Sequence, residues 1–192
     1  MRDTLKVDAR RWFVAGGLLL LMSITSLGYV QAAGLTAAEK YWLTYMREEE
    51  KLARDVYLAM HAKWGAAIFA NIAASEQRHM NAVKSLLVKY NLPDPVSDDT
   101  PGEFTDTFQA LYDTLEAQGS VSLVEALKVG VFIEKTDIHD LNAASALTTR
   151  RDIKKVYSNL LQGSYNHLDA FCSDLEKRGV TPCEAYDPDP AL

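Results

Sequence analysis

From Leu35 onward, apolar side chains recur at every third or fourth position, and no segment alternates as a half-buried strand would. The periodicity predicts a chain built from amphipathic helices. Thr36 and Glu39 have the spacing of a capping box, and Gly65 is a typical left-handed helix stop. The first helix is therefore expected from residue 36 to about residue 64.

Similar start and stop signals divide the rest of the chain. A second helix is expected over about residues 66–90, before Pro93 and Pro95. Thr100 to Glu103 form another capping box, with Pro101 at the first helical position, and this predicts a shorter helix ending at residue 119. Ser122 and Thr149 cap the last two expected helices, over 122–146 and 149–178.

The expected fold is all-α: an antiparallel four-helix bundle with a short extra helix in the crossover between bundle helices 2 and 3. About 160 residues follow the amino-terminal segment, enough for one domain with its own core. A long crossover between two helical pairs is a feature of ferritin-like bundles, because simple up-down bundles use short loops throughout.

The first 32 residues have the features of a secretory signal peptide. Arg10 and Arg11 precede an apolar run, and Val30-Gln31-Ala32 is a V-x-A cleavage site. The arginine pair fits both a twin-arginine signal and a general secretory signal, and an uncleaved membrane anchor is a third alternative. We predict cleavage after Ala32, a single domain over 33–192, and a periplasmic or extracellular product.

Charge and cysteine content fit an exported protein. The full chain carries −6, and the first 32 residues hold four basic and two acidic residues, so the remainder carries −8. This balance argues against nucleic-acid binding and against stable association with an anionic membrane after cleavage. Cys172 and Cys183 are the two cysteines, and in an oxidising compartment such a pair predicts a disulfide.

Ionisable residues interrupt the apolar stripe of each long helix near its midpoint. In chain order, the polar residues expected on these inner faces are Glu49, Glu76, His79, Glu134, Asp137, Ser164 and His167, with Glu50 at the flank of the first stripe as an alternative to Glu49. Midpoints of antiparallel helices share one layer. Buried carboxylates that converge without a partner repel one another, so a divalent metal ion is the expected counter-charge.

Other interpretations apply to each residue taken singly. Arg47, Arg54 or Arg78 could pair with a buried glutamate, and residues 48–50 could belong to a solvated charged run. Tyr57 and Tyr157 face inward, where they fit core packing or a hydrogen bond to a ligand. His61 and His139 do not face a stripe and receive no role.

Glu49 followed by Glu76-Gln77-Arg78-His79 resembles half of the di-metal site of ferritins and rubrerythrins. Residues 48–57, 75–80, 133–141 and 163–168 also resemble a prokaryotic ferritin-like family of unassigned function. The resemblance implies a ferritin-like fold and metal ligands at Glu49, Glu76, His79, Glu134 and His167. It departs from the pattern at Ser164, where a glutamate is expected, and Asp137 is positioned to replace that carboxylate.

We therefore expect a metal-binding protein with one or two ions per chain, iron or manganese, with zinc as a further choice. The leading hypothesis is a ferroxidase- or peroxidase-like oxidoreductase whose partners are metal ions and a small oxidant, in a chain compatible with homo-oligomers. Two alternatives stay open: a protein that sequesters a single metal without turnover, and a metal-free helical interaction module with a buried polar layer.

Overall fold

The structure, a computed structural model, describes residues 34–183, with residues 106 and 107 described in their backbone alone. Five helices and no strand lie in this range: α2 (Ala37–Trp64), α3 (Ala67–Lys89), α4 (Asp106–Gly119), α5 (Leu123–Ala146) and α6 (Arg151–Lys177). The predicted all-helical class is confirmed. None of these helices is both long and apolar enough to cross a membrane. The predicted signal peptide lies outside the described residues.

Helix ends follow local capping chemistry at several of the expected positions. Thr36 caps α2 in a reciprocal capping box with Glu39, and Gly65 ends this helix in the left-handed conformation with φ 64°. The Ser122 hydroxyl accepts from the Glu125 amide and caps α5. The last helix differs slightly from expectation, since its N-cap is Arg150 and no side chain supplies the cap hydrogen bond.

The prediction that the short helix begins at Thr100 is wrong. α4 begins at Asp106, and the preceding residues form turns in which Gly102 has φ 81°. The carbonyl oxygens of Thr100 and Glu103 both accept from the Lys51 ammonium, at 2.9 Å each. The sequence pattern assigned Thr100 and Glu103 to the first turn of the short helix. Tertiary contacts with α2 hold them outside it.

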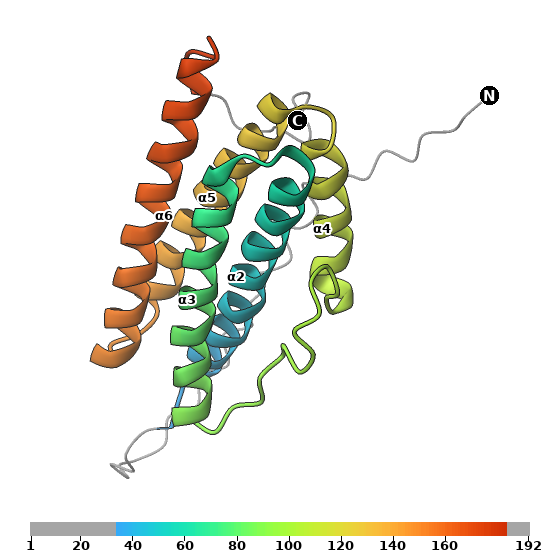
Figure 1. The fold of residues 1–192 in the computed structure, drawn as a ribbon. Helices are drawn as coiled ribbons and strands as arrows, with labels where there is room; N and C mark the ends of the chain where they lie inside the picture. Colours follow the sequence, from blue (N-terminus) through green and yellow to red (C-terminus); the bar gives the residue numbers. More distant parts are fainter. Residues whose placement is uncertain (1–33, 184–192) are drawn as a thin grey trace, which may run out of the picture. The chain divides into compact units, whose positions relative to one another are not determined.

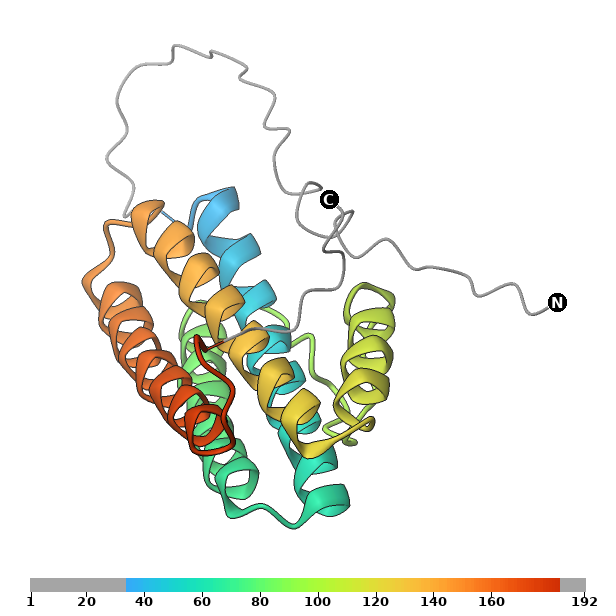
Figure 2. The same cartoon turned by 90° about the horizontal axis from the view of Figure 1, so that it is seen from above.

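The four long helices lie side by side, and α4 lies against α2 and α5 (Figures 1 and 2). α2 packs on α3, α3 on α6, α6 on α5, and α5 on α2. Residues 65–66 join the first pair and residues 147–150 join the second, so the members of each pair run in opposite directions. The crossover over residues 90–122 connects the pairs and carries α4.

The buried apolar side chains form two clusters with a polar layer between them. One cluster includes Leu52, Val56, Phe69, Ile72, Leu127, Val131 and Phe171, and the other includes Met46, Val83, Leu87, Leu141, Ile153 and Leu160. On every long helix the sequence between the clusters contains the polar residues described above. The apolar clusters therefore enclose that layer from both ends and remove most of its contact with water.

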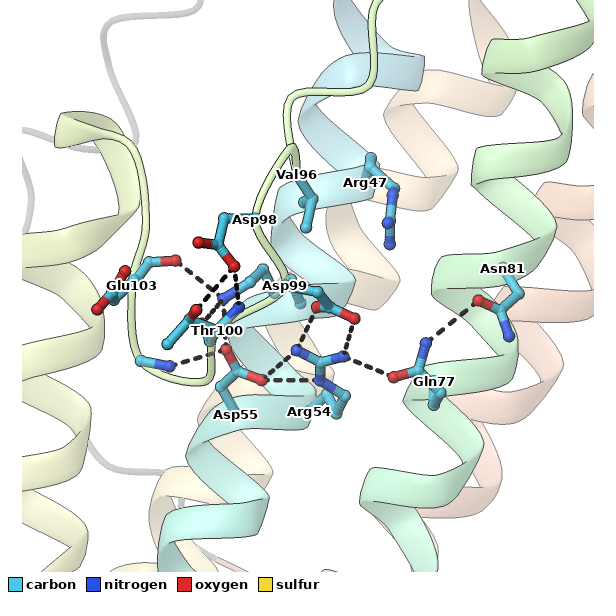
Figure 3. Close-up of polar contacts among 12 residues, drawn as sticks. Arg47, Arg54, Asp55, Gln77, Asn81, Val96, Asp98, Asp99, Thr100 and Glu103 are labelled. Atoms are coloured by element: carbon cyan, nitrogen blue, oxygen red, sulfur yellow. Dashed lines mark hydrogen bonds and ion pairs between the residues drawn. The ribbon is translucent and has the colours of Figure 1, made fainter.

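An ionic network that is buried on its α2 side ties the crossover to α2 (Figure 3). Arg54 binds Asp99 of the crossover through both terminal guanidinium nitrogens, at 2.7 and 3.1 Å, and its Nε donates to Asp55. Lys51 donates to Asp55 at 2.6 Å, and the Lys51 side chain is only 2% exposed. These contacts fix the helix that carries Glu49 and Glu50.

Candidate metal centre

All four long helices contribute ionisable or hydroxyl side chains to the polar layer. They are Glu49 and Glu50 on α2, Glu76 and His79 on α3, Glu134 and Asp137 on α5, and Ser164 and His167 on α6. Each of the carboxylates among them is at most 6% exposed. All of these carboxylates therefore lie in the buried interior between the four long helices.

Two groups of three residues bring potential ligand atoms within 4.8 Å of one another: Glu50 with Glu76 and His79, and Glu76 with Glu134 and His167. Glu76 belongs to both. Its Oε2 lies 2.7 Å from His79 Nδ1, and its Oε1 lies 2.7 Å from His167 Nδ1. The two imidazole rings are stacked with their centroids 5.6 Å apart. A single carboxylate therefore contacts both imidazoles, one with each oxygen.

Several polar atoms in the layer accept or donate no hydrogen bond within residues 34–183. They are Glu50 Oε1, Glu76 Oε1, Asp137 Oδ1 and His167 Nδ1, together with Glu49 Oε2. His167 Nδ1 and Glu76 Oε1 are close, yet their orientation is not that of a hydrogen bond. Two ligands at right angles on one ion, each ~2.1 Å from it, lie ~3.0 Å apart. The donor set and these unpartnered atoms therefore fit a metal centre.

Without a metal, the layer distributes protons to reduce repulsion. Burial, then the Glu76 charge, raises the pKa of Glu134 to about 8, and burial with the charges of Asp137 and neighbours raises the pKa of Glu50 well above its usual range. Burial also favours protonated Glu76, but contact with His167 and His79 outweighs it and lowers the Glu76 pKa to about 2. A divalent cation would replace these protons as counter-charge.

Neighbouring carboxylates favour the protonated forms of both histidines. Burial alone would lower the pKa of each ring, but Glu50 and Glu76 raise that of His79 to about 11. Glu134 and Glu76 raise that of His167 to about 9. A metal ion and a proton compete for the same imidazole nitrogen, so both rings are sites where metal binding would release a proton.

Glu49, the predicted ligand of the first helix, is 4% exposed but belongs to neither three-residue group. The α2 residue beside His79 is Glu50 and not Glu49: Glu50 Oε2 lies 3.1 Å from His79 Nδ1. Asp137 also lies outside both groups. It accepts a hydrogen bond from Ser164, and its charge acts on both Glu49 and Glu50.

Two residues near the ligand atoms received no firm role from the sequence. The buried Tyr57 hydroxyl on α2 donates to Glu134 Oε1 at 2.6 Å. Of the two roles considered for Tyr57, core packing or a hydrogen bond to a ligand residue, this contact is the second. Gly163 lies directly against His79: a Cβ at this position would come within 2.5 Å of the ring. A glycine on the inner face of a helix, four residues before a histidine, was the available signal.

The basic residues of α2 do not neutralise the layer. Arg47 binds Asp94 of the crossover at 3.0 Å. Figure 3 shows Arg54 bound to Asp55 and Asp99. The charged run is also not solvated, because every residue from 47 to 57 is buried. Pairing of the layer with Arg47 or Arg54 and a solvated charged run are thus both disfavoured, and Arg78 is exposed.

Cys172 and Cys183 form the expected disulfide, with their Cα atoms 5.2 Å apart. The bond connects α6 to the segment that follows it. His61 and His139 lie outside the two ligand groups, and the His139 side chain is 78% exposed.

Comparison with known proteins places the chain among related sequences. It is 53% identical over 153 residues to the uncharacterized protein MJ0754 of Methanocaldococcus jannaschii, an alignment covering 79% of this chain and 83% of the relative. The structure matches the crystal structure of hypothetical protein MJ0754 from Methanococcus jannaschii with a TM-score of 0.76 and 49% identity, over 85% of this chain and 90% of that one. Residues 39–188 match the uncharacterized protein domain DUF2202. The chain belongs to the DUF2202 family.

Proposed function

We propose that this protein is a ferritin-like metal protein that holds two iron or manganese ions and acts as an oxidoreductase on oxygen or peroxide. The observation that carries the proposal is the position of Glu76, whose two oxygens face two different histidines in two ligand groups. A single-ion site needs no such shared carboxylate. Oxygen and imidazole donors together suit iron, manganese or zinc.

The arrangement of the helices supports the ferritin-like bundle. The packing order α2, α3, α6, α5 and a long crossover between the two pairs are the features expected of that fold. An antiparallel pair supplies Glu50, Glu76 and His79, and the second pair supplies Glu134 and His167. The disulfide is consistent with the proposed exported location, because such bonds persist in oxidising compartments.

Bound iron or manganese would supply the redox change and the Lewis acidity of the reaction. The chain supplies the rest. Glu76 sets the two ligand groups side by side, Tyr57 orients Glu134 through a hydrogen bond, and the two apolar clusters limit the access of water. Asp137, held by Ser164, adds negative charge beside Glu50.

The test compares metal content and turnover in matched variants. Wild-type protein purified natively should contain two metal ions per chain by elemental analysis. It should also oxidise Fe²⁺ or a reduced dye in the presence of oxygen or peroxide. Glu76→Gln should lose both ions, because the residue is shared, whereas the exposed His139→Ala should keep both. Bound metal without turnover would indicate a sequestering protein. A wild type without metal would contradict the proposal.

A further inference from the structure

A second pair of carboxylates lies beside the two ligand groups and belongs to neither of them. The carboxyl groups of Glu49 on α2 and Asp140 on α5 interact directly, and the residues are 4% and 8% exposed. Two neighbouring carboxylates repel unless a proton or a cation lies between them. Glu49 Oε2 is buried and accepts no hydrogen bond from residues 34–183.

The charges closest to Glu49 are of one sign. Asp137, Asp140 and Glu50 act on it most strongly, and all three are acidic. The basic side chains that neighbour Glu49 in sequence point elsewhere, since Arg47 binds Asp94 and Lys51 binds Asp55. A structural role in which Glu49 pairs with a base therefore has no support in these contacts.

The pair also occupies an intermediate position between solvent and the metal centre. On the outer side, the His139 side chain is 78% exposed, and its Nδ1 lies 2.8 Å from Asp140 Oδ1. Burial, then the charges of Asp140 and Glu49, raise the pKa of the half-exposed Tyr41. On the inner side, Glu49 adjoins Glu50 in the chain, and Asp137 precedes Asp140 by nearly one helical turn, ~4.5 Å along α5. The pair thus lies between the exposed His139 and the chain neighbours of the first ligand group.

We propose that Glu49 and Asp140 form a loading subsite, which receives a hydrated divalent cation from solvent and delivers it to the group of Glu50, Glu76 and His79. The proposal rests on the metal centre proposed above and adds the route by which it fills. Carboxylate oxygens alone bind divalent cations weakly and exchange them readily, whereas a site that adds imidazole binds transition metals more tightly. Transfer inward is therefore favourable.

The test separates the rate of metal uptake from the amount of metal bound. Co²⁺ serves as the probe, because its absorbance spectrum reports its ligands and can be followed by stopped-flow mixing. Glu49→Gln and Asp140→Asn remove charge without changing size. Both should slow Co²⁺ uptake about tenfold or more, because an acidic approach raises the local cation concentration. The final stoichiometry and spectrum should equal those of the wild type.

The matched control is Glu48→Gln, the same change one residue away. Glu48 faces the crossover, where it accepts from the Thr105 hydroxyl at 2.6 Å, so uptake should keep the wild-type rate. Thermal unfolding of the metal-free variants checks folding: Glu49→Gln should be at least as stable as the wild type, because a neutral amide replaces a buried acidic group.

Three outcomes would overturn the loading subsite. Wild-type uptake rates in both Glu49→Gln and Asp140→Asn would show that the pair does not lie on the route. A changed spectrum or a lower stoichiometry in Glu49→Gln would make Glu49 a ligand instead. A wild type that binds no Co²⁺ at equilibrium would overturn the metal centre itself, and this result differs from the other two because no uptake would be seen in any variant.

Discussion

At the scale of single residues, the projection of each helix predicted which side chains face inward, and it worked best on α3, α5 and α6. Glu76 and Glu134 lie in the polar layer, as expected from their places on apolar stripes. The projection was least informative on α2. This helix contacts α3, α4 and α5, so it is buried on most sides over residues 46–57. Neighbouring Glu49 and Glu50 are therefore both buried, and only tertiary structure shows that Glu50 faces His79.

The hydrogen bond from Tyr57 to Glu134 should affect one ligand group and not the other. Tyr57→Phe removes only the hydroxyl and leaves Glu134 without a donor that orients it. Loss of such a partner typically weakens metal binding by about 10- to 100-fold. We expect the second ion to be lost first when Mn²⁺ is withdrawn with a competing chelator. Tyr165→Phe, at an exposed tyrosine on α6, is the control and should bind like the wild type.

Gly163 should be required for the position of the His79 ring. In Gly163→Ala the new methyl group would lie within 2.5 Å of ring atoms, so the imidazole must move. The matched change is Gly130→Ala, whose methyl group would come within 2.7 Å of the Phe171 ring in an apolar cluster. Both variants should lower the unfolding temperature, because overpacking of this kind costs about 1–3 kcal/mol. In titrations with Mn²⁺, Gly163→Ala alone should lose affinity; equal losses in both would contradict a specific role for Gly163.

At the scale of elements, the bounds of α2 were predicted closely, whereas the start of α4 was misplaced. Thr36 and Gly65 bound α2 as expected because their capping bonds lie within a few residues. Thr100 and Glu103 carry an equally good local signal, but their carbonyl oxygens bind Lys51, 49 and 52 residues away in the chain. A contact over that separation leaves no local trace in the sequence.

Lys51 should therefore contribute more to stability than an ordinary lysine. Lys51→Met keeps much of the side-chain volume but leaves Asp55 and two carbonyl groups without their shared donor. Breaking a buried ion pair from one side costs about 3–5 kcal/mol. Urea unfolding should show a loss of that size. Lys84→Met is the control: its pair with Asp94 has a lysine side chain that is 52% exposed, and exposed pairs contribute about 0–1 kcal/mol. Similar losses in the two variants would argue against the network's role.

At the scale of the whole described domain, the two ligand groups differ in what they connect. Glu50, Glu76 and His79 all lie on α2 and α3, a pair joined by two residues. Glu76, Glu134 and His167 lie on α3, α5 and α6, so this group spans both helical pairs. Helix midpoints predicted one layer, and the family resemblance placed Glu76 and His79 in one half-site. That Glu76 also faces His167 of the other pair is seen only in the tertiary structure, because helix midpoints give a height and no partner.

This difference predicts a distinct pattern of stabilisation by metal. Binding to the native state stabilises by about 2.7 kcal/mol per site when free ion is at 100 times its dissociation constant. In wild-type protein, saturating Mn²⁺ should slow amide hydrogen exchange in all four long helices. His79→Ala should keep protection in α3, α5 and α6, because the group of Glu76, Glu134 and His167 is intact. His167→Ala should keep Mn²⁺-dependent protection in α2 and α3 alone. His139→Ala should match the wild type, and the same uniform pattern in His79→Ala and His167→Ala would rule out two separate ligand groups.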